Sequence, residues 1–170
     1  MHDTVQEKHS WEQKLKEGEI AEEYLDKYFQ QWYEIYHAND AQQHNGIDRI
    51  FKTPKSGLVW TVEYKADTAA ATTGNAFIET MSVAEKNKAG WALTSQAQIL
   101  VYFIPPNECG TMVSMYEIKK KLPYWLQNFS VRKALNETYH GEGVVIPLIE
   151  LTRLGKTFRT DKFGWSHESE

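Results

Sequence analysis

One uninterrupted apolar run limits the folds open to this chain. Residues 99–104 read Ile-Leu-Val-Tyr-Phe-Ile and are followed at once by Pro105 and Pro106. A short apolar run that ends at a turn signal is typical of a fully buried central strand. It is far shorter than the roughly 20 apolar residues that a helix needs to cross a bilayer. The run therefore predicts a β-sheet with this strand in its interior.

The segments around this run predict one α/β (α+β) domain, with a mixed central sheet flanked by helices. Ser10 and Gln13 have the spacing of a capping box that opens a helix, which we expect to end near Tyr36. The buried stripe expected on this helix contains Ala21, Tyr24, Leu25, Tyr28 and Trp32. Further strands are predicted over residues 47–53, 58–65, 76–81, 111–115 and 144–149, and a second helix over 116–128.

Two prolines and the chain ends refine this outline. Pro123 should strain or end the second helix, and Pro147 should place the last strand at a sheet edge. No repeat or linker divides the 170 residues, so we expect a single domain over 1–170. Its ordered core is expected over about residues 10–163, with short frayed ends.

Composition narrows the class of protein. Hydrophobic residues make up 41% of the chain and charged residues 25%, which is ordinary for a globular protein rather than a disordered or fibrous one. Cys109 is the single cysteine and can form neither an internal disulfide nor a zinc site. The polar start Met1-His2-Asp3-Thr4 is unlike a secretory signal. These features predict a cytoplasmic protein that is stabilised by its core.

The charge distribution leaves a nucleic-acid partner open despite a net charge of −4. Residues 1–112 hold 10 Lys and Arg against 16 Asp and Glu, whereas residues 113–165 hold 9 against 5. An electrostatic footprint depends on such local clustering rather than on the total charge. The candidate phosphate contacts are Lys119, Lys120, Lys121, Arg132 and Lys133. The alternative interpretation of each cluster is an ordinary solvated face.

A predicted hairpin brings three chemically useful side chains together. Glu63 and Lys65 are two apart on a strand, so both point to the same face. If Lys55 and Ser56 form the centre of the turn, the register places Asp48 directly across from Glu63, with Cβ atoms about 5 Å apart. A slip of one residue would undo this pairing, and bulges are common beside active sites.

Such an arrangement favours a divalent cation. Two carboxylates at this distance repel each other, and a cation between them removes the conflict. Mg²⁺ prefers hard oxygen ligands and is bound through one or two carboxylates together with water and substrate phosphate. A bound Mg²⁺ lowers the pKa of its water and stabilises charge on a phosphate. Lys65 would orient that water or neutralise the charge that develops. The pattern therefore predicts metal-dependent hydrolysis of phosphodiester bonds.

The same residues resemble the PD-(D/E)XK nuclease superfamily. Gly46-Ile47-Asp48, a short hairpin and Val62-Glu63-Tyr64-Lys65 match its D…(D/E)-x-K signature, although the leading proline is absent. Gly18-Glu19-Ile20-Ala21-Glu22 is similar to the helical glutamate motif of resolvase-like members. Residues 73–79, followed by Gly90-Trp91 and a hydrophobic strand, are similar to small nucleases of phages and mobile elements.

This resemblance implies a restriction-endonuclease-like fold of about four or five strands, DNA as the substrate and often a homodimer. It implies that Asp48, Glu63 and the backbone carbonyl of Tyr64 bind Mg²⁺, with Mn²⁺ as an alternative. Lys65 would activate the water. Glu22, which falls at the border of the buried helix stripe, would complete the site or bind a second ion.

Several of these residues have structural alternatives. Glu63 and Lys65 taken alone are most simply an exposed charge pair. Glu79 has two interpretations. It supports either Lys65 or the metal, or it is a solvated strand residue, and the solvated residue is the simpler expectation.

Aromatic residues near the lysine run have two interpretations as well. Tyr116, Tyr124 and Trp125 are placed to stack on bases, but core packing is the simpler expectation. The rival function for the whole chain is a non-catalytic nucleic-acid-binding or assembly domain that retains the nuclease fold. A metal-dependent phosphatase or nucleotide hydrolase has less support, because the sequence contains no glycine-rich phosphate loop.

Overall fold

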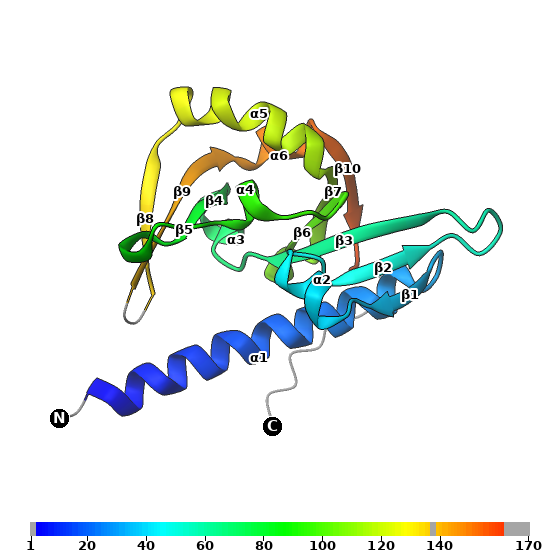
Figure 1. Ribbon diagram of the computed structural model, residues 1–170, viewed down its shortest axis with the longest axis horizontal. Helices are drawn as coiled ribbons and strands as arrows, with labels where there is room; N and C mark the ends of the chain where they lie inside the picture. Colours follow the sequence, from blue (N-terminus) through cyan, green and yellow to red (C-terminus); the bar gives the residue numbers. More distant parts are fainter. Residues whose placement is uncertain (1–2, 137–138, 162–170) are drawn as a thin grey trace.

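Two β-sheets form the centre of the protein (Figure 1), and the computed structural model describes residues 3–136 and 139–161. The six-stranded sheet has the order β1 (Glu34–His37), β2 (Arg49–Lys52), β3 (Val59–Ala66), β6 (Ile99–Ile104), β7 (Cys109–Ser114) and β10 (Gly155–Arg159). The four-stranded sheet has the order β5 (Lys88–Ala89), β4 (Asn75–Val83), β9 (Tyr139–Pro147) and β8 (Val131–Asn136). Strands β3 and β6 pair in parallel, and the remaining pairs are antiparallel. The predicted mixed α/β domain is confirmed, although its strands form two sheets rather than one.

Strand β6 lies inside the six-stranded sheet, as its apolar run predicts. Leu100 and Tyr102 belong to a core shared with the four-stranded sheet, whereas Val101 and Phe103 belong to a second core on the other face. All four side chains are at most 3% exposed. Because successive strand residues point to opposite faces, one apolar run supplies both cores.

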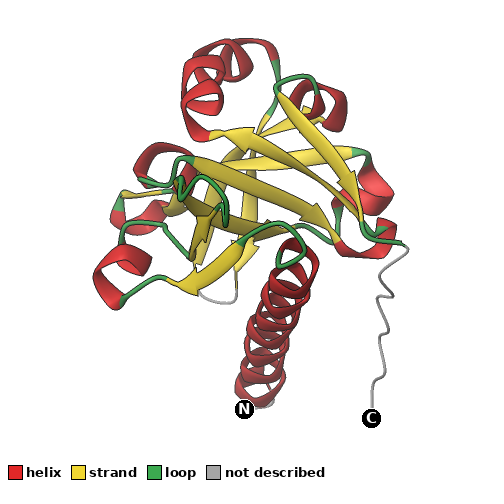
Figure 2. Cartoon of the chain, turned by 90° about the vertical axis from the view of Figure 1, so that its right-hand side faces the viewer, coloured by secondary structure: helices red, strands yellow, loops and turns green. Residues whose placement is uncertain are grey.

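Helix α1 (Asp3–Phe29) covers one face of the six-stranded sheet, and its N-terminal part extends beyond the sheets (Figure 2). Ala21, Tyr24, Leu25 and Phe29 are buried against β3 and β6. The predicted start at Ser10 is wrong, because that residue lies inside the helix, and so is the predicted end near Tyr36. The chain turns after Phe29 because the next residues pair with β2 as strand β1. Trp32 therefore lies beyond the helix and is 52% exposed rather than buried.

Helix α5 (Met115–Asn128) lies over the four-stranded sheet, on the opposite side of the molecule from α1 (Figure 1). It continues through Pro123 to the predicted end at Asn128, so of the two alternatives for this proline, strain or termination, termination is wrong. Leu122 and Trp125 are buried on either side of Pro123 and hold the helix on the core. Pro123 itself is exposed, where its ring meets solvent.

The other helices are short connections. They are α2 (Asp40–His44), α3 (Ala70–Thr73), α4 (Trp91–Thr94), α6 (Leu148–Thr152) and the 3₁₀ turns η1 (Ala84–Lys86) and η2 (Pro105–Asn107). Strand β9 runs between β4 and β8, so its predicted place at a sheet edge is wrong. Pro147 is tolerated because it is the last residue of β9, beyond the point where β8 pairs with it. Within the described ranges, no helix is both long enough and apolar enough to cross a membrane.

Candidate active site

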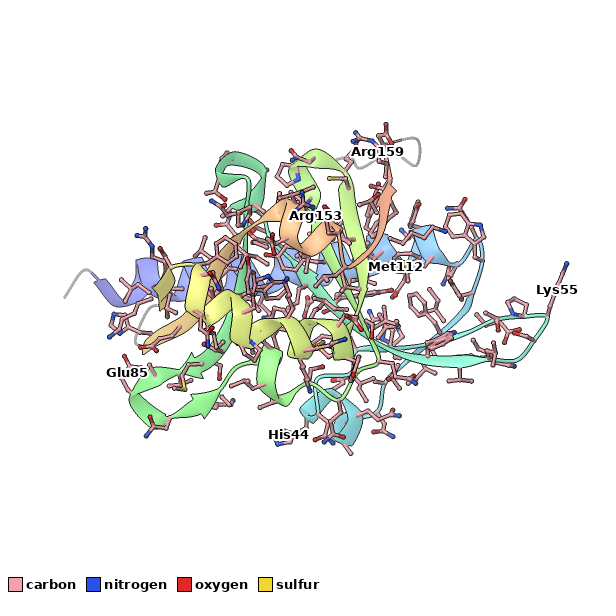
Figure 3. The ribbon with its side chains drawn as sticks, turned by 90° about the horizontal axis from the view of Figure 1, so that it is seen from above. His44, Lys55, Glu85, Met112, Arg153 and Arg159 are labelled. Carbon is pink, nitrogen blue, oxygen red and sulfur yellow. The ribbon has the colours of Figure 1, made fainter. Side chains whose placement is uncertain are left out.

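The hairpin of β2 and β3 has the register that its turn predicts. Arg49 pairs with Val62 and Phe51 pairs with Trp60, and Lys55 lies at the far end of the hairpin (Figure 3). Continued by one residue, this register brings Asp48 opposite Glu63. The regular ladder ends there, because the Asp48 amide donates to the carbonyl of Val62 instead. Pairing departs from the regular register at Asp48, and the contact made there joins the Asp48 carboxylate to the amide of Tyr64, the residue after Glu63.

Backbone contacts fix Asp48 from several directions. Its Oδ2 accepts a hydrogen bond of 2.7 Å from the backbone N–H of Tyr64. Its carbonyl accepts bonds from the Ala38 amide at 3.1 Å and from Arg49 Nη1 at 3.0 Å. The N–H and C=O of one strand residue point to the same side. The carbonyl of Tyr64 therefore lies on the edge of β3 that faces Asp48, where the sequence places a metal ligand.

Glu63 is buried, which the alternative of an exposed charge pair did not anticipate. Its side chain is 3% exposed, whereas that of Lys65 is 37% exposed, and Lys65 Nζ lies 2.8 Å from Glu63 Oε1. The other oxygen, Oε2, is the one buried side-chain polar atom in the described residues that has no hydrogen-bond partner. An unsatisfied buried oxygen costs free energy, and a charged one costs more. One side of this carboxylate is thus satisfied and the other is not.

The negative charges of three carboxylates raise the pKa of Lys65. Burial lowers its pKa, but the ion pair and hydrogen bond with Glu63 and the charges of Asp48 and Glu79 outweigh burial and raise the pKa above its usual value. Glu79 comes from β4 in the other sheet and is half-buried. Burial raises the pKa of Glu79, although Lys65 and a bond from the Trp91 backbone partly offset that effect. Glu79 is therefore half-buried rather than fully solvated, and its role as a support for Lys65 stays a prediction.

Glu22 reaches the same region from α1. Its Oε2 lies 3.1 Å from Arg49 Nη2, and its side chain is 36% exposed. Burial raises the pKa of Glu22, the charge of Asp48 raises it further, and Arg49 only partly offsets them. A cleft of about 260 Å³ is lined by Glu19, Glu22, Glu23, His37, Gln43, Asp48 and Arg49. Glu22 thus lies beside Asp48, as the motif comparison implies, but it is already paired with an arginine.

That arginine belongs to a buried network that sequence reasoning missed. Arg49 is 4% exposed, and its Nε donates to both carboxylate oxygens of Asp26, at 3.0 and 2.9 Å. The hydroxyl of Tyr64 donates to Asp26 at 3.0 Å, and the guanidinium lies 5.5 Å from the centre of the Tyr64 ring. A signal was present, because Asp26 lies four residues after Glu22, at the same border of the apolar stripe. Through the Arg49 bonds to Glu22 and to the Asp48 carbonyl, this network positions two candidate site residues.

The oxygen atoms around Asp48 and Glu63 suit a divalent cation that also keeps bound water. No three Asp, Glu, His or Cys side chains within residues 3–136 and 139–161 are grouped closely enough to enclose a metal ion by themselves. Mg²⁺ does not need such a group, because it usually keeps several waters and takes one or two carboxylates. The unpartnered Oε2 of Glu63 and the carboxylate of Asp48 are the side-chain ligands available, together with the carbonyl of Tyr64, the residue after Glu63.

The five candidate phosphate contacts lie in two places. Lys119 Nζ donates to the carbonyl of Ser95 at 2.6 Å. Lys120 and Lys121 lie over tyrosine rings of the same helix, α5. On β8, Arg132 is exposed and Lys133 Nζ is 3.8 Å from Glu142 Oε1.

The aromatic residues near these lysines divide between surface and core. Trp125 is fully buried, as expected of a core residue. Tyr116 and Tyr124 are 70% and 46% exposed, so the expectation that they pack in the core is wrong. The outer side of α5 therefore carries both aromatic and basic groups.

Comparison with known proteins gave no family model, no curated protein and no solved structure that matches this chain. The resemblance to PD-(D/E)XK nucleases thus stays a prediction from short motifs. What the chain does must be argued from the geometry of its own residues.

Proposed function

We propose that this protein is a metal-dependent nuclease that hydrolyses phosphodiester bonds of DNA at Asp48, Glu63 and Lys65. The observation that carries the proposal is the buried carboxylate of Glu63, which has a lysine on one oxygen and, within the part of the chain that the structure describes, no partner on the other. Retaining an unsatisfied buried carboxylate is costly for a residue that serves only stability. A free carboxylate oxygen is useful, however, in a residue that binds a cation.

The residues would divide the work as follows. Asp48 and Glu63, with the Tyr64 carbonyl, would hold Mg²⁺ or Mn²⁺, which supplies Lewis acidity and lowers the pKa of a bound water. Lys65 would orient the attacking water and neutralise charge that develops on the phosphate oxygens. Water oxygen bonds to phosphorus as the bond from phosphorus to the leaving sugar oxygen breaks. The water's protons pass to solvent and to that leaving oxygen, and no covalent enzyme intermediate forms.

Residues around this centre would position it. Glu79 faces Lys65 from the second sheet and would set the orientation of its ammonium group. Glu22 would complete the site through its position beside Asp48, or bind a second ion after its arginine moves. Lys119, Lys120, Lys121, Arg132 and Lys133 would contact phosphates, which sets affinity and its dependence on salt rather than sequence preference.

A non-catalytic nucleic-acid-binding domain is the second candidate, and one observation favours it. Lys65 already forms a 2.8 Å ion pair with Glu63, as expected of a lysine that only neutralises a buried carboxylate. In that case the site would contribute to stability and the basic residues alone would contact DNA.

A cleavage assay separates the two candidates. Linear, branched and single-stranded DNA, with one RNA, would be incubated with the protein in Mg²⁺, in Mn²⁺ and in EDTA. A nuclease should cut at least one substrate in the metal buffers and none in EDTA, and Glu63→Gln should not cut. Binding without cleavage of any substrate would favour the second candidate. Replacing the five basic residues by Ala should weaken DNA binding and flatten its dependence on salt in either case.

A further inference from the structure

We propose that the outer side of α5 binds unpaired nucleotides of a DNA strand. The surface consists of Tyr116, Lys120, Lys121 and Tyr124, which we call the α5 stripe. The proposal builds on the proposed function, because the strand held there would be the one delivered to Asp48 and Glu63.

The α5 stripe is the solvent-facing side of an amphipathic helix. Ile118, Leu122 and Trp125 are at most 4% exposed and face the core, whereas the rings of Tyr116 and Tyr124 are 70% and 46% exposed. Residues four apart lie on one side of a helix, and eight residues span about 12 Å. The two rings therefore form two separate exposed platforms along one side of α5.

Each ring has a lysine of its own. Lys120 Nζ lies 5.9 Å from the centre of the Tyr116 ring, and Lys121 Nζ lies 4.1 Å from that of Tyr124. A cation over one face of a ring holds the ring in place and puts a positive charge next to it, while a base can stack on the other face. This alternation suits a single strand, whose bases stack on aromatic rings while its phosphates contact cations. A duplex would use only the lysines, because its bases are already stacked on one another.

The α5 stripe begins close to the candidate active site. The amide of Met115 donates to the carbonyl of Gln98, and the amide of Gln98 donates to the carbonyl and hydroxyl of Thr61 at 3.0 Å each. Thr61 precedes Glu63 by two residues on β3 and points to the same face.

A second link runs from the middle of α5. Lys119 donates to the carbonyl of Ser95, whose hydroxyl donates to the carbonyl of Gly46, two residues before Asp48. The N-terminal half of α5, where the stripe begins, is thus linked through hydrogen bonds to the strand and the loop that carry both candidate metal ligands. A nucleotide strand held on it can continue into the site.

The test measures DNA binding by the full chain in EDTA, where no cleavage takes place. The probes are a fluorescein-labelled oligo-dT and a duplex of the same length. Tyr116→Ala/Tyr124→Ala should weaken oligo-dT binding about tenfold or more and duplex binding less than threefold. Tyr116→Phe/Tyr124→Phe keeps both rings and should bind like the parent. Tyr36→Ala is the matched control, because Tyr36 is 50% exposed and lies on β1.

A second measurement avoids variants. An oligo-dT with one 2-aminopurine should lose fluorescence on binding the parent protein if bases stack on the rings. Equal weakening for both DNAs, no weakening, or unchanged 2-aminopurine fluorescence would overturn the proposal. Cleavage of a duplex with no effect of the tyrosine changes would remove this inference and leave the nuclease function standing. Strand binding through the tyrosines without cleavage of any DNA would do the reverse.

Discussion

The two faces of strand β3 carry buried charge in opposite ways. Toward α1, Asp26 accepts two bonds from Arg49 and one from the Tyr64 hydroxyl. Toward the four-stranded sheet, Glu63 has Lys65 on one oxygen and no partner on the other within the described residues. Both carboxylates belong to residues that are less than 9% exposed. Both oxygens of Asp26 therefore have partners, whereas only one oxygen of Glu63 has one; we call the Glu63 carboxylate half matched.

Under the proposed function, this difference separates a carboxylate that stabilises the fold, Asp26, from one that binds the metal, Glu63. A buried ion pair is destabilised strongly when one partner is removed, because the other charge is left alone. A half-matched carboxylate already destabilises the folded protein, because one of its charged oxygens is buried without a partner. Removing its charge should therefore change the free energy of unfolding little. The following predictions test this contrast with matched changes on the two faces, from the largest expected effect to the smallest.

The first prediction removes the charge on the site face. Glu63→Gln and Asp48→Asn should each reduce cleavage by at least about a thousandfold, roughly 4 kcal/mol, because the metal loses a carboxylate. Calorimetric titration with Mn²⁺ should show lost affinity. The free energy of unfolding of Glu63→Gln should stay within about 1 kcal/mol of the parent value, since Lys65 can turn to water. Unchanged Mn²⁺ binding in both variants would contradict the site.

The second prediction makes the same chemical change on the opposite face. Asp26→Asn should lower the free energy of unfolding by about 3 kcal/mol, because Arg49 is left buried with a neutral partner. Cleavage per folded molecule should remain within about tenfold of the parent rate. Urea denaturation at pH 7 measures the first quantity. A loss below about 1 kcal/mol would mean that the two faces do not differ.

The third prediction concerns Lys65, which forms an ion pair with Glu63 and has a proposed role in the chemistry. Lys65→Ala should slow cleavage about a hundredfold while DNA binding is retained, because the lysine acts in the transition state. It should also destabilise the protein by leaving Glu63 unpaired. Adding Glu63→Gln should restore stability but not cleavage, and Lys65→Arg is the control that keeps the charge. If Lys65→Ala cleaves as fast as the parent, another residue activates the water.

The smallest effect is expected for Glu79, and it concerns how the stability of the protein depends on pH. Burial raises its pKa above the usual 4.5 in the folded protein. Just above pH 4.5 the folded state keeps a proton that the unfolded chain has released. The contribution of Glu79 to stability is thus present below this window and is lost as pH rises through it.

Glu79→Gln has no such proton, so its stability relative to the parent should improve with rising pH. The slope cannot exceed about 1.4 kcal/mol per pH unit, the value for one proton. Urea denaturation in EDTA at pH 4, 5, 6 and 7 measures it. Identical pH dependence in both proteins would show that Glu79 is solvated.

The sequence predicted correctly those elements that have a continuous apolar run or a recognisable turn. The apolar run predicted β6 to the residue, because six consecutive apolar side chains can be buried only when both faces are covered. The register of β2 and β3 followed from its turn, and it brings Asp48 to the end of β3 that carries Glu63, where the Asp48 carboxylate accepts a bond from the next residue, Tyr64. Short polar strands such as β1 and β10 were missed, because they gain their order from pairing with a neighbour.

Tertiary structure alone decided which charges are buried and which of them are matched. The bond between Arg49 and Asp26 joins residues 23 apart, and that between Tyr64 and Asp26 joins residues 38 apart. Glu79 approaches Lys65 from a different sheet. A periodic pattern shows which face a side chain takes, but not what the rest of the chain places against that face. The sequence therefore determined where the carboxylates lie along the hairpin, and the packing of the second sheet decided that Glu63 is buried with one oxygen unpaired among the described residues.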